Sequence, residues 1–408
     1  MQLFLESVVI ALSAIWANKM RSFLTVLGNI VAVTSIIAVV SLIRGLNGAV
    51  TDAIQNELGI DSFRVERQGI ARSGEEEDAQ RNNPRVTLDD ARAIRRYTTL
   101  VKSILATDDA GAQVTYKDKQ IDQVRITGVS SDYVDFPTYT IEQGRLITPI
   151  EVDRSRALVI VGWDVADKLF GGAVSPLDKV IKINGVNFRI VGVNEKKGSI
   201  FGQSLDNFAV MPLGAYQRLF GARLYLSLAV KPTEPLLMRA AMDETTVAMR
   251  IGRRLKPKDR NNFGIVSAES ALDFFHSITN WIANVLVGVV ALSLVVGGIV
   301  IMNIMLMVVT ERTSEIGLRK SLGARRRDIM WQILTESITL SITGGVVGTG
   351  LGFLLALVMS KVTPLPAAVE AWSVVAGISV TAIVGLFFGL YPAMRAARLD
   401  PIEALRKE

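Results

Sequence analysis

Residues 281–309 read WIANVLVGVVALSLVVGGIVIMNIMLMVV, a run without one Asp, Glu, Lys or Arg. About 20 apolar residues are enough for a helix to cross the roughly 30 Å of hydrocarbon in a bilayer, and this run is longer. A dense charged stretch follows at once, TERTSEIGLRKSLGARRRDIMWQILTE at 310–336. Three more uncharged runs lie at Phe23–Ile43, Ser337–Ser360 and Trp372–Tyr391. The sequence therefore predicts a membrane protein with four transmembrane α-helices.

The composition agrees with this prediction. Half of the residues are hydrophobic and 21% are charged, and the mean hydropathy is +0.35, so the apolar residues must be clustered. The absence of cysteine excludes disulfides, thiolate chemistry and cysteine metal sites. The net charge of +6 is explained by membrane topology and does not indicate nucleic-acid binding.

The long segment between the first two spans alternates predicted strands and helices. Phe63–Gln68 has a strand pattern, Thr87 and Asp90 form a capping-box pattern, and Asn184–Gly185 predicts a hairpin turn. The polar stretch 69–84 is expected to be a mobile loop, and strands are expected around 113–128. The fold class is thus four transmembrane helices plus an α+β extracytoplasmic domain of two subdomains, with a β-rich part inserted into the other.

The charge distribution orients the spans and divides the chain. Lys19 and Arg21 precede the first span, basic residues fill 310–330, and more follow the fourth span, so both termini and that loop are expected in the cytoplasm. The first span is expected to be a retained anchor and not a cleaved signal peptide. The predicted parts are a cytoplasmic amphipathic helix (1–21), TM1 (22–44), an outer domain (45–278, with 128–222 inserted between 45–127 and 223–278), TM2 (279–310), a cytoplasmic coupling segment (311–330), TM3 (331–360), an outer loop (361–371), TM4 (372–392) and a cytoplasmic tail (393–408).

Catalytic chemistry has no signature in this chain. The one histidine, His276, has no neighbours that suggest a triad, no P-loop motif exists, and the acidic residues lack metal-ligand spacing. We therefore expect no catalytic residue, no metal and no cofactor bound by the chain itself.

Glycines recur at every fourth position in the last two spans, which allows helices to approach closely in lipid. This spacing serves packing among the spans of one chain or a dimer interface, and we favour the first. The helix-packing candidates are Gly344, Gly348, Gly352, Gly385 and Gly389.

The charged segment between the second and third spans is suited to docking a partner, although a simple positive-inside loop would have a similar composition. Glu315 and Arg319 form a favourable i, i+4 pair, Gly323 is expected to end a helix, and Ala324–Asp328 can begin the next one.

Several stretches resemble the MacB/FtsX family of ABC-transporter permeases, and together they cover nearly the whole chain. The resemblance rests on ANKMRSFLTVLGNIVAV (17–33), GRLI (144–147), ALVIVG (157–162), LFGG (169–172), INGVNFRIVGV (183–193), MPLGAYQRLFG (211–221), VVGGIVIMNIMLMVVT (295–310) with the charged segment after it, ITGGVVGTGLGF (342–353) and YPAMRAARLDPIEALRKE (391–408).

The resemblance implies a non-catalytic membrane subunit of an ATP-driven complex in the bacterial plasma membrane. A separate ABC ATPase would supply ATP and Mg, and a second permease would complete a homodimer or heterodimer. A periplasmic adaptor and an outer-membrane channel are further partners that the resemblance allows but does not decide. ATP-driven movement would be passed to the outer domain (mechanotransmission) for export or efflux. The alternatives are an FtsX-like scaffold that activates an extracytoplasmic hydrolase and a lipoprotein-extracting permease. The implied ATPase-coupling residues are Glu311, Glu315, Arg319, Lys320, Gly323, Ala324 and Arg325.

Overall fold

The computed structural model describes residues 19–59, 61–136, 138–171, 174–200, 202–221, 223–362 and 371–406. These residues form two compact units. A helical unit contains the chain up to Gly48 and from Ile278 onward, and a strand-rich unit contains Ala49–Ser277. The predicted amphipathic helix (1–21) lies almost wholly outside the described residues, and so does most of the predicted outer loop (361–371).

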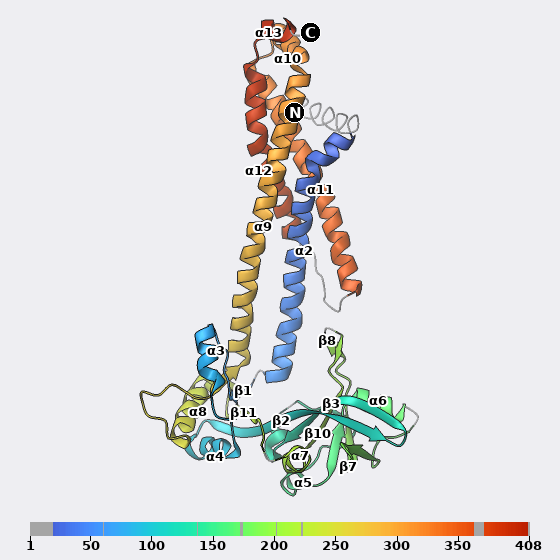
Figure 1. Cartoon of the computed structure of the whole chain (residues 1–408), viewed down its shortest axis with the longest axis vertical. Helices are drawn as coiled ribbons and strands as arrows, with labels where there is room; N and C mark the ends of the chain where they lie inside the picture. The colour runs from blue at the N-terminus through green and yellow to red at the C-terminus, as the bar shows by residue number, and fades with distance from the viewer. Residues whose placement is uncertain are drawn as a thin grey trace. The chain divides into compact units, whose positions relative to one another are not determined.

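The helical unit is built on four long helices, which confirms the four predicted spans. Figure 1 shows them running lengthwise, with two short helices at the end near the C-terminus. Packing between two of the long helices includes a hydrogen bond that the Ser337 hydroxyl donates to the Gly385 carbonyl, at 2.9 Å. The helices are α2 (Lys19–Leu58), α9 (Ala268–Glu311), α10 (Thr313–Ser321), α11 (Arg326–Val362), α12 (Ala371–Arg398) and α13 (Pro401–Arg406).

Two of these helices are much longer than their uncharged runs. The α2 helix has 40 residues and the α9 helix has 44. At about 1.5 Å per residue, α9 is about 66 Å long, roughly twice the hydrocarbon thickness of a bilayer. Both helices belong partly to the helical unit and partly to the strand-rich unit, so each connection between the units is an unbroken helix.

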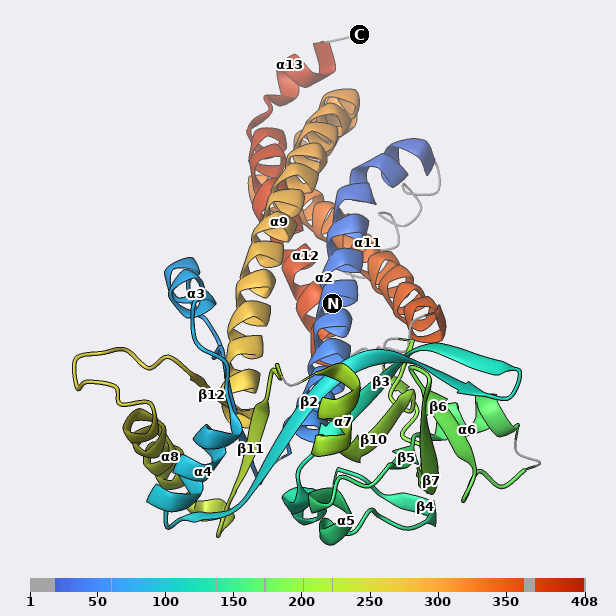
Figure 2. The ribbon, with the colours of Figure 1, turned by 60° about the horizontal axis from the view of Figure 1, so that its bottom comes forward.

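The strand-rich unit contains a ten-stranded sheet in the order β12-β1-β11-β2-β3-β10-β5-β7-β4, with β6 pairing β2 and β7 (Figure 2). A separate hairpin, β8–β9, stands off this sheet. The strands are β1 (Phe63–Glu66), β2 (Val101–Tyr116), β3 (Lys119–Val129), β4 (Ile141–Gly144), β5 (Leu158–Val161), β6 (Val180–Ile183), β7 (Val186–Asn194), β8 (Ser199–Ile200), β9 (Gln203–Ser204), β10 (Phe208–Pro212), β11 (Ser227–Pro232) and β12 (Gly264–Ser267).

Both faces of the sheet are covered, and the alternation along β10 shows why. Ala209 and Met211 point into one core with α4, α6, α7 and α8, whereas Phe208 and Val210 point into a second core with η1 and α5. Successive side chains of a strand point to opposite faces of the sheet, so a strand whose residues are all apolar is expected to be buried on both faces. The remaining helices are α3 (Gly74–Arg81), α4 (Leu88–Tyr97), η1 (Ser131–Asp135), α5 (Pro149–Asp153), α6 (Trp163–Phe170), α7 (Leu213–Phe220), η2 (Pro235–Leu237) and α8 (Met238–Gly252).

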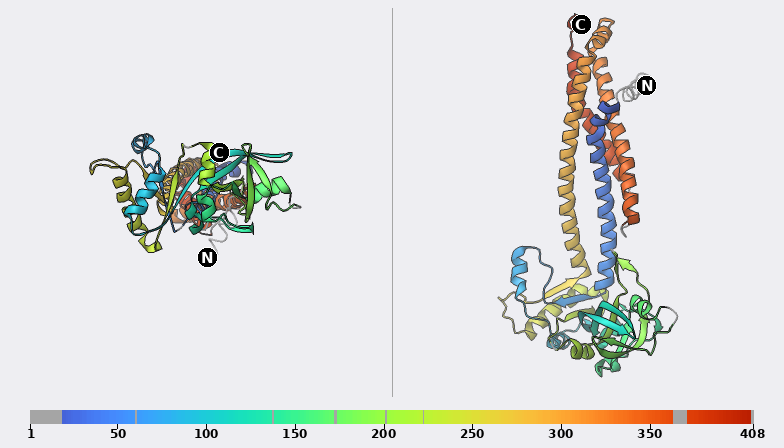
Figure 3. Two further views of the ribbon diagram at one scale, coloured as in Figure 1. Left: turned by 90° about the horizontal axis from the view of Figure 1, so that it is seen from below. Right: turned by 45° about the vertical axis from the view of Figure 1, so that its right-hand side comes forward.

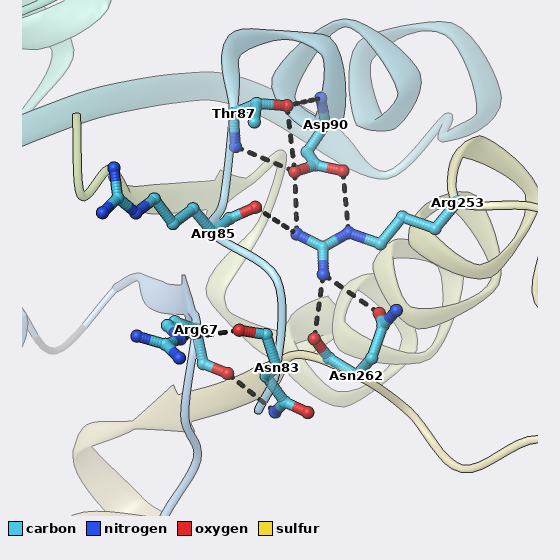
Figure 4. A network of polar contacts seen from close by, with 7 residues as sticks. All are labelled: Arg67, Asn83, Arg85, Thr87, Asp90, Arg253 and Asn262. Carbon is cyan, nitrogen blue, oxygen red and sulfur yellow. Dashed lines mark hydrogen bonds and ion pairs between the residues drawn. The ribbon is translucent and has the colours of Figure 1, made fainter. Parts of the chain in front are cut away.

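A buried ion pair joins α4 to the end of α8, two helices that lie side by side in Figure 3. Arg253 donates two hydrogen bonds to the Asp90 carboxylate, at 2.9 and 2.8 Å, and the two side chains are only 9% and 8% exposed. Figure 4 shows the rest of the guanidinium group satisfied by the Asn262 and Arg85 carbonyls and the Asn262 amide oxygen. Asp90 also closes the predicted capping box with Thr87, which is therefore confirmed.

The strand-rich unit differs from the sequence prediction in three places. Residues 74–81 form a helix where a loop is predicted, because Ser73 caps it and three glutamates favour its first turn. Strand β2 begins at Val101, well before the predicted strands near 113. The predicted border between subdomains, at 127/128, falls inside β3, so one hydrogen-bonded sheet crosses it. The Asn184–Gly185 hairpin is confirmed by the pairing of β6 with β7.

Candidate coupling site

The candidate site is the turn from α9 through α10 into α11. The Thr313 hydroxyl donates to the Val309 and Thr310 carbonyls, at 3.1 and 2.8 Å, across the break between α9 and α10. Gly323 follows α10 with a φ of 100°, a left-handed conformation that ends the helix without a Cβ clash. The Asp328 carboxylate then accepts from the Arg325 backbone N–H at 3.0 Å, at the start of α11.

One face of α10 is held against the ends of the other helices. Ile316 is buried in a cluster built from α9, α11 and α12. A Cβ placed on Gly317 would lie 2.6 Å from the Ala404 Cβ, so α13 packs directly on the α10 backbone at this point. The Lys320 ammonium group donates to the Ala397 carbonyl at 3.0 Å and to the Leu399 carbonyl. Helix α10 is thus fixed on α12 and α13 by apolar packing and by a lysine that satisfies a helix C-terminus.

The opposite face of α10 is open. Glu315 and Arg319 form the predicted i, i+4 ion pair, at 2.6 Å, with their side chains 49% and 39% exposed. Leu318 and Leu322 lie on the same side, and Leu322 is 80% exposed. An exposed leucine pair beside a charged pair is what a docked protein surface can cover. We name this surface, defined by Glu315, Leu318, Arg319 and Leu322, the coupling face.

An ion pair fixes where α10 begins. Arg312, the residue before α10, pairs with Glu336 of α11 at 3.3 Å. Glu336 is mostly buried, so its partner restricts the direction in which the chain leaves α9.

The predicted coupling residues fall in three different places. Glu315 and Arg319 lie on the coupling face, and Arg325 is exposed just before α11. Lys320 is turned toward the carbonyls of α12, and Ala324 packs on the buried cluster around Ile316. Glu311 is the last residue of α9, and Gly323 forms the turn. The coupling role of these residues stays a prediction.

The five predicted packing glycines all lie against neighbouring helices of the same chain. A Cβ on Gly344, Gly348 or Gly352 would meet α2, with Val26 Cβ at 3.1 Å, the Ile30 carbonyl at 2.8 Å and Ile37 Cβ at 2.9 Å, respectively. Gly385 and Gly389 lie against Ser337 and Ser341 of α11. Each of these glycines thus faces another span of the same chain, and the choice of packing over a dimer interface stays a prediction.

Sequence reasoning missed two features of the helical unit. Gly28 of α2 and Gly297 of α9 meet so closely that a Cβ on Gly28 would lie 2.6 Å from the Gly297 Cα. The Gly297–Gly298 pair in the second span was the available signal, but it lacks the four-residue spacing that we used. Leu318 and Leu322 were also missed, although two leucines four residues apart in a charged helix indicate an apolar stripe.

Among the described residues, no group of three or more His, Asp or Glu side chains is arranged to hold a metal ion.

Comparisons with known proteins cover both units. The family described as MacB-like periplasmic core domain matches residues 22–248, and the family described as FtsX-like permease C-terminal matches residues 287–401. The macrolide export ATP-binding/permease protein MacB of Bdellovibrio bacteriovorus is 35% identical over 394 residues, which are 96% of this chain and 60% of that protein. The chain therefore spans about 60% of the length of this MacB relative.

A second relative matches this chain over nearly the full length of both proteins. YknZ of Bacillus subtilis, described as an uncharacterized ABC transporter permease, is 31% identical over 408 residues, which are 99% of each chain. The crystal structure of the extracellular domain of YknZ, a noncanonic ABC-type transporter from Gram-positive bacteria, is 19% identical with a TM-score of 0.41, and covers 50% of this chain and 100% of that one. With one family match over more than half of its length and a full-length permease relative, this chain belongs to the MacB/FtsX family of ABC-transporter permeases.

Proposed function

We propose that this permease couples ATP hydrolysis by a partner ATPase to movement of its strand-rich unit, and that this movement serves export. The assignment as a permease rests on the family match. The partnership with an ATPase, the movement of the strand-rich unit and the role in export are proposals. The observation that carries the proposal is the continuity of α2 and α9, each a single helix that belongs to both units. A displacement at one end of such a helix reaches the other without an intervening loop.

The coupling face supports the choice of partner. It presents an exposed ion pair and the exposed leucines Leu318 and Leu322 on a helix whose other face is fixed by Ile316, Gly317 and Lys320. A helix that is fixed on one side and open on the other can pass a push from a docked protein to the helices behind it. Relatives of the MacB type are described as ATP-binding/permease proteins, which supports an ATPase as that protein.

The proposed assembly is a pair of permeases with ATPase subunits that carry ATP and Mg. The proposed setting is the bacterial plasma membrane, with both termini and the coupling face on the cytoplasmic side. In thermodynamic terms, the outer movement can be no larger in free energy than the difference in ATP affinity between the closed and open assemblies.

The test is ATP turnover by the cognate ATPase, co-expressed in membranes with the wild-type chain or with a variant. The Glu315→Ala/Arg319→Ala and Leu318→Ser/Leu322→Ser variants are expected to lose permease-dependent turnover and co-purification of the ATPase. The matched control is Asp89→Ala/Arg92→Ala, which removes an exposed carboxylate–arginine pair from α4 of the strand-rich unit and should leave turnover unchanged. If no ATPase associates with the wild-type chain, the proposal is wrong.

A further inference from the structure

Three arginines surround a small pocket between α11 and α12. The pocket has a volume of about 160 Å³ and is lined by Arg326, Arg327, Met330, Met394, Ala397 and Arg398. The methionines and Ala397 supply apolar walls, and the three arginine side chains are exposed around them.

The positive charge of this pocket is not balanced within the described part of the chain. No carboxylate there pairs with Arg326, Arg327 or Arg398, although acidic partners are found for other arginines such as Arg312 and Arg319. Like charges gathered around one hollow repel each other, and a bound anion relieves that repulsion. Guanidinium groups bind phosphate through paired hydrogen bonds, so a phosphate group matches this chemistry.

Aromatic side chains place the pocket at the level of lipid headgroups. Trp331 lies one helical turn after Arg327 on α11, and Tyr391 lies one turn before Met394 on α12. Trp331 is 53% exposed and Tyr391 is 52% exposed. Exposed Trp and Tyr on membrane helices gather at the boundary between hydrocarbon and water.

We propose that the pocket binds the phosphate headgroup of an anionic phospholipid, whose acyl chains lie along exposed apolar side chains of α11 and α12. Basic pockets between membrane helices are suited to anionic headgroups. A free phosphate ion would balance the arginines but would leave Met330 and Met394 without an apolar partner. The proposal requires only that α11 and α12 cross a bilayer, so it stands apart from the coupling role of α10.

The first test is native mass spectrometry of the full chain released from nanodiscs of phosphatidylcholine mixed with phosphatidylglycerol. The wild-type chain is expected to retain phosphatidylglycerol selectively. An arginine near an anionic surface contributes about fivefold to binding, so Arg326→Ala/Arg327→Ala/Arg398→Ala should lower this retention by a factor on the order of a hundred. The matched control, Arg92→Ala/Arg96→Ala/Arg239→Ala, removes the same charge from the exposed surface of the strand-rich unit and should retain the lipid as the wild type does.

Two further arms separate the sources of the anion. Millimolar inorganic phosphate should not displace phosphatidylglycerol, and displacement would overturn the lipid assignment in favour of a soluble anion. If the alanine variant retains the lipid like the wild type but loses a co-expressed ATPase, the pocket is a protein-docking surface and the proposal is wrong. If the alanine variant does not fold, the variant Arg326→Lys/Arg327→Lys/Arg398→Lys replaces it. This variant keeps the charge and is expected to retain phosphatidylglycerol more weakly than the wild type. Equal retention of phosphatidylcholine and phosphatidylglycerol by the wild-type chain would refute the site.

Discussion

Arg253 is a buried charge of the strand-rich unit, and its hydrogen-bond partners come from two separate segments of the chain. Its guanidinium group reaches Asp90 on α4, the Arg85 carbonyl before that helix, and Asn262 before β12. No sequence pattern predicted this convergence, since Asp90 was assigned only to the local capping box. A local motif can be read from spacing, but a partner 163 positions away cannot.

Replacing Arg253 by leucine should therefore destabilise the contact between α4 and α8. Breaking a buried pair from one side leaves an uncompensated charge, which costs about 3–5 kcal/mol. Hydrogen exchange of the α4 and α8 amides in the full chain would measure the loss. The Asp90→Asn/Arg253→Leu double variant keeps an acceptor for the cap without the orphaned charge, so it should be more stable than Arg253→Leu alone; equal or lower stability would contradict the account.

Glu151 provides a pH-dependent prediction in the same unit. Hydrogen bonds from Arg145, together with those from Thr148 at the start of α5, lower the pKa of Glu151 from 4.5 to about 2. The ionised carboxylate therefore stabilises the fold above pH 4.5, and this contribution is lost as the pH falls through about 2.

Glu151→Gln keeps an oxygen that can accept at the start of α5 but removes the charge paired with Arg145, so it should lower the unfolding temperature at neutral pH, with a free-energy loss of about 0.5–1 kcal/mol. The gap between wild type and variant should shrink as the pH approaches 2. Thermal unfolding of both chains across this pH range is the measurement, and a gap that does not change with pH would speak against the assigned cause.

At the scale of elements, uninterrupted apolar runs and short turn motifs were the reliable signals. The four spans and the hairpin at Asn184–Gly185 followed from them. The first half of β2 was not predicted, because Asp108, Asp109 and Gly111 suggest a loop. In the fold the Asp108 carboxylate accepts from the Tyr225 N–H and the Asp109 carboxylate accepts from the Thr127 hydroxyl. Tertiary partners thus turn poor strand formers into strand residues.

The close crossing of α2 and α9 gives a prediction for these elements. Gly28→Val should force the helices apart, because its side chain would enter the Gly297 backbone, and overpacking of this kind costs about 1–3 kcal/mol. Gly48 lies on the same helix with nothing within 4 Å of an added Cβ, so Gly48→Val is a matched control for helix propensity. Thermal stability of the detergent-solubilised chain should fall for Gly28→Val and stay near wild type for Gly48→Val. Equal stabilities for the two variants would argue that the crossing tolerates a side chain.

For the whole molecule, the sequence predicted the division into a helical unit and a strand-rich unit better than it predicted the strand pairing within the strand-rich unit. Long apolar helices are read from composition alone, whereas a sheet depends on pairings between distant segments. Strand β2 shows the difference, because it pairs with β11 along its first half and with β3 and β6 along its second. Such a strand has no single partner in the sequence, and it binds together the two parts that the sequence suggested were separate.

The unbroken α9 helix can be tested by interrupting it. Two glycines inserted between Asp273 and Phe274 should leave ATPase association intact but remove the response of the outer unit to ATP. The absence of native cysteine allows one spin label per chain at an Ile150→Cys substitution, so distances between paired permeases can be measured with and without ATP. The same insertion between Lys117 and Asp118, at the β2–β3 turn, is the control. An ATP-dependent distance change that survives the α9 insertion would show that helix continuity is not required.

The two long helices differ in how they join the sheet of the strand-rich unit. Strand β12 ends at Ser267 and α9 begins at Ala268, with the Ser267 and Ser270 side chains hydrogen-bonded to each other's backbone N–H groups. Between α2 and β1, by contrast, the chain passes through Gly59, whose φ of 75° is left-handed. Bending requires backbone that can change its torsion angles, and the α2–β1 junction contains a residue suited to this while the β12–α9 junction does not. Under the proposed coupling, the α2–β1 junction would act as the hinge and the β12–α9 junction as the rigid arm, so a push along both helices would swing the sheet in an arc instead of lifting it straight.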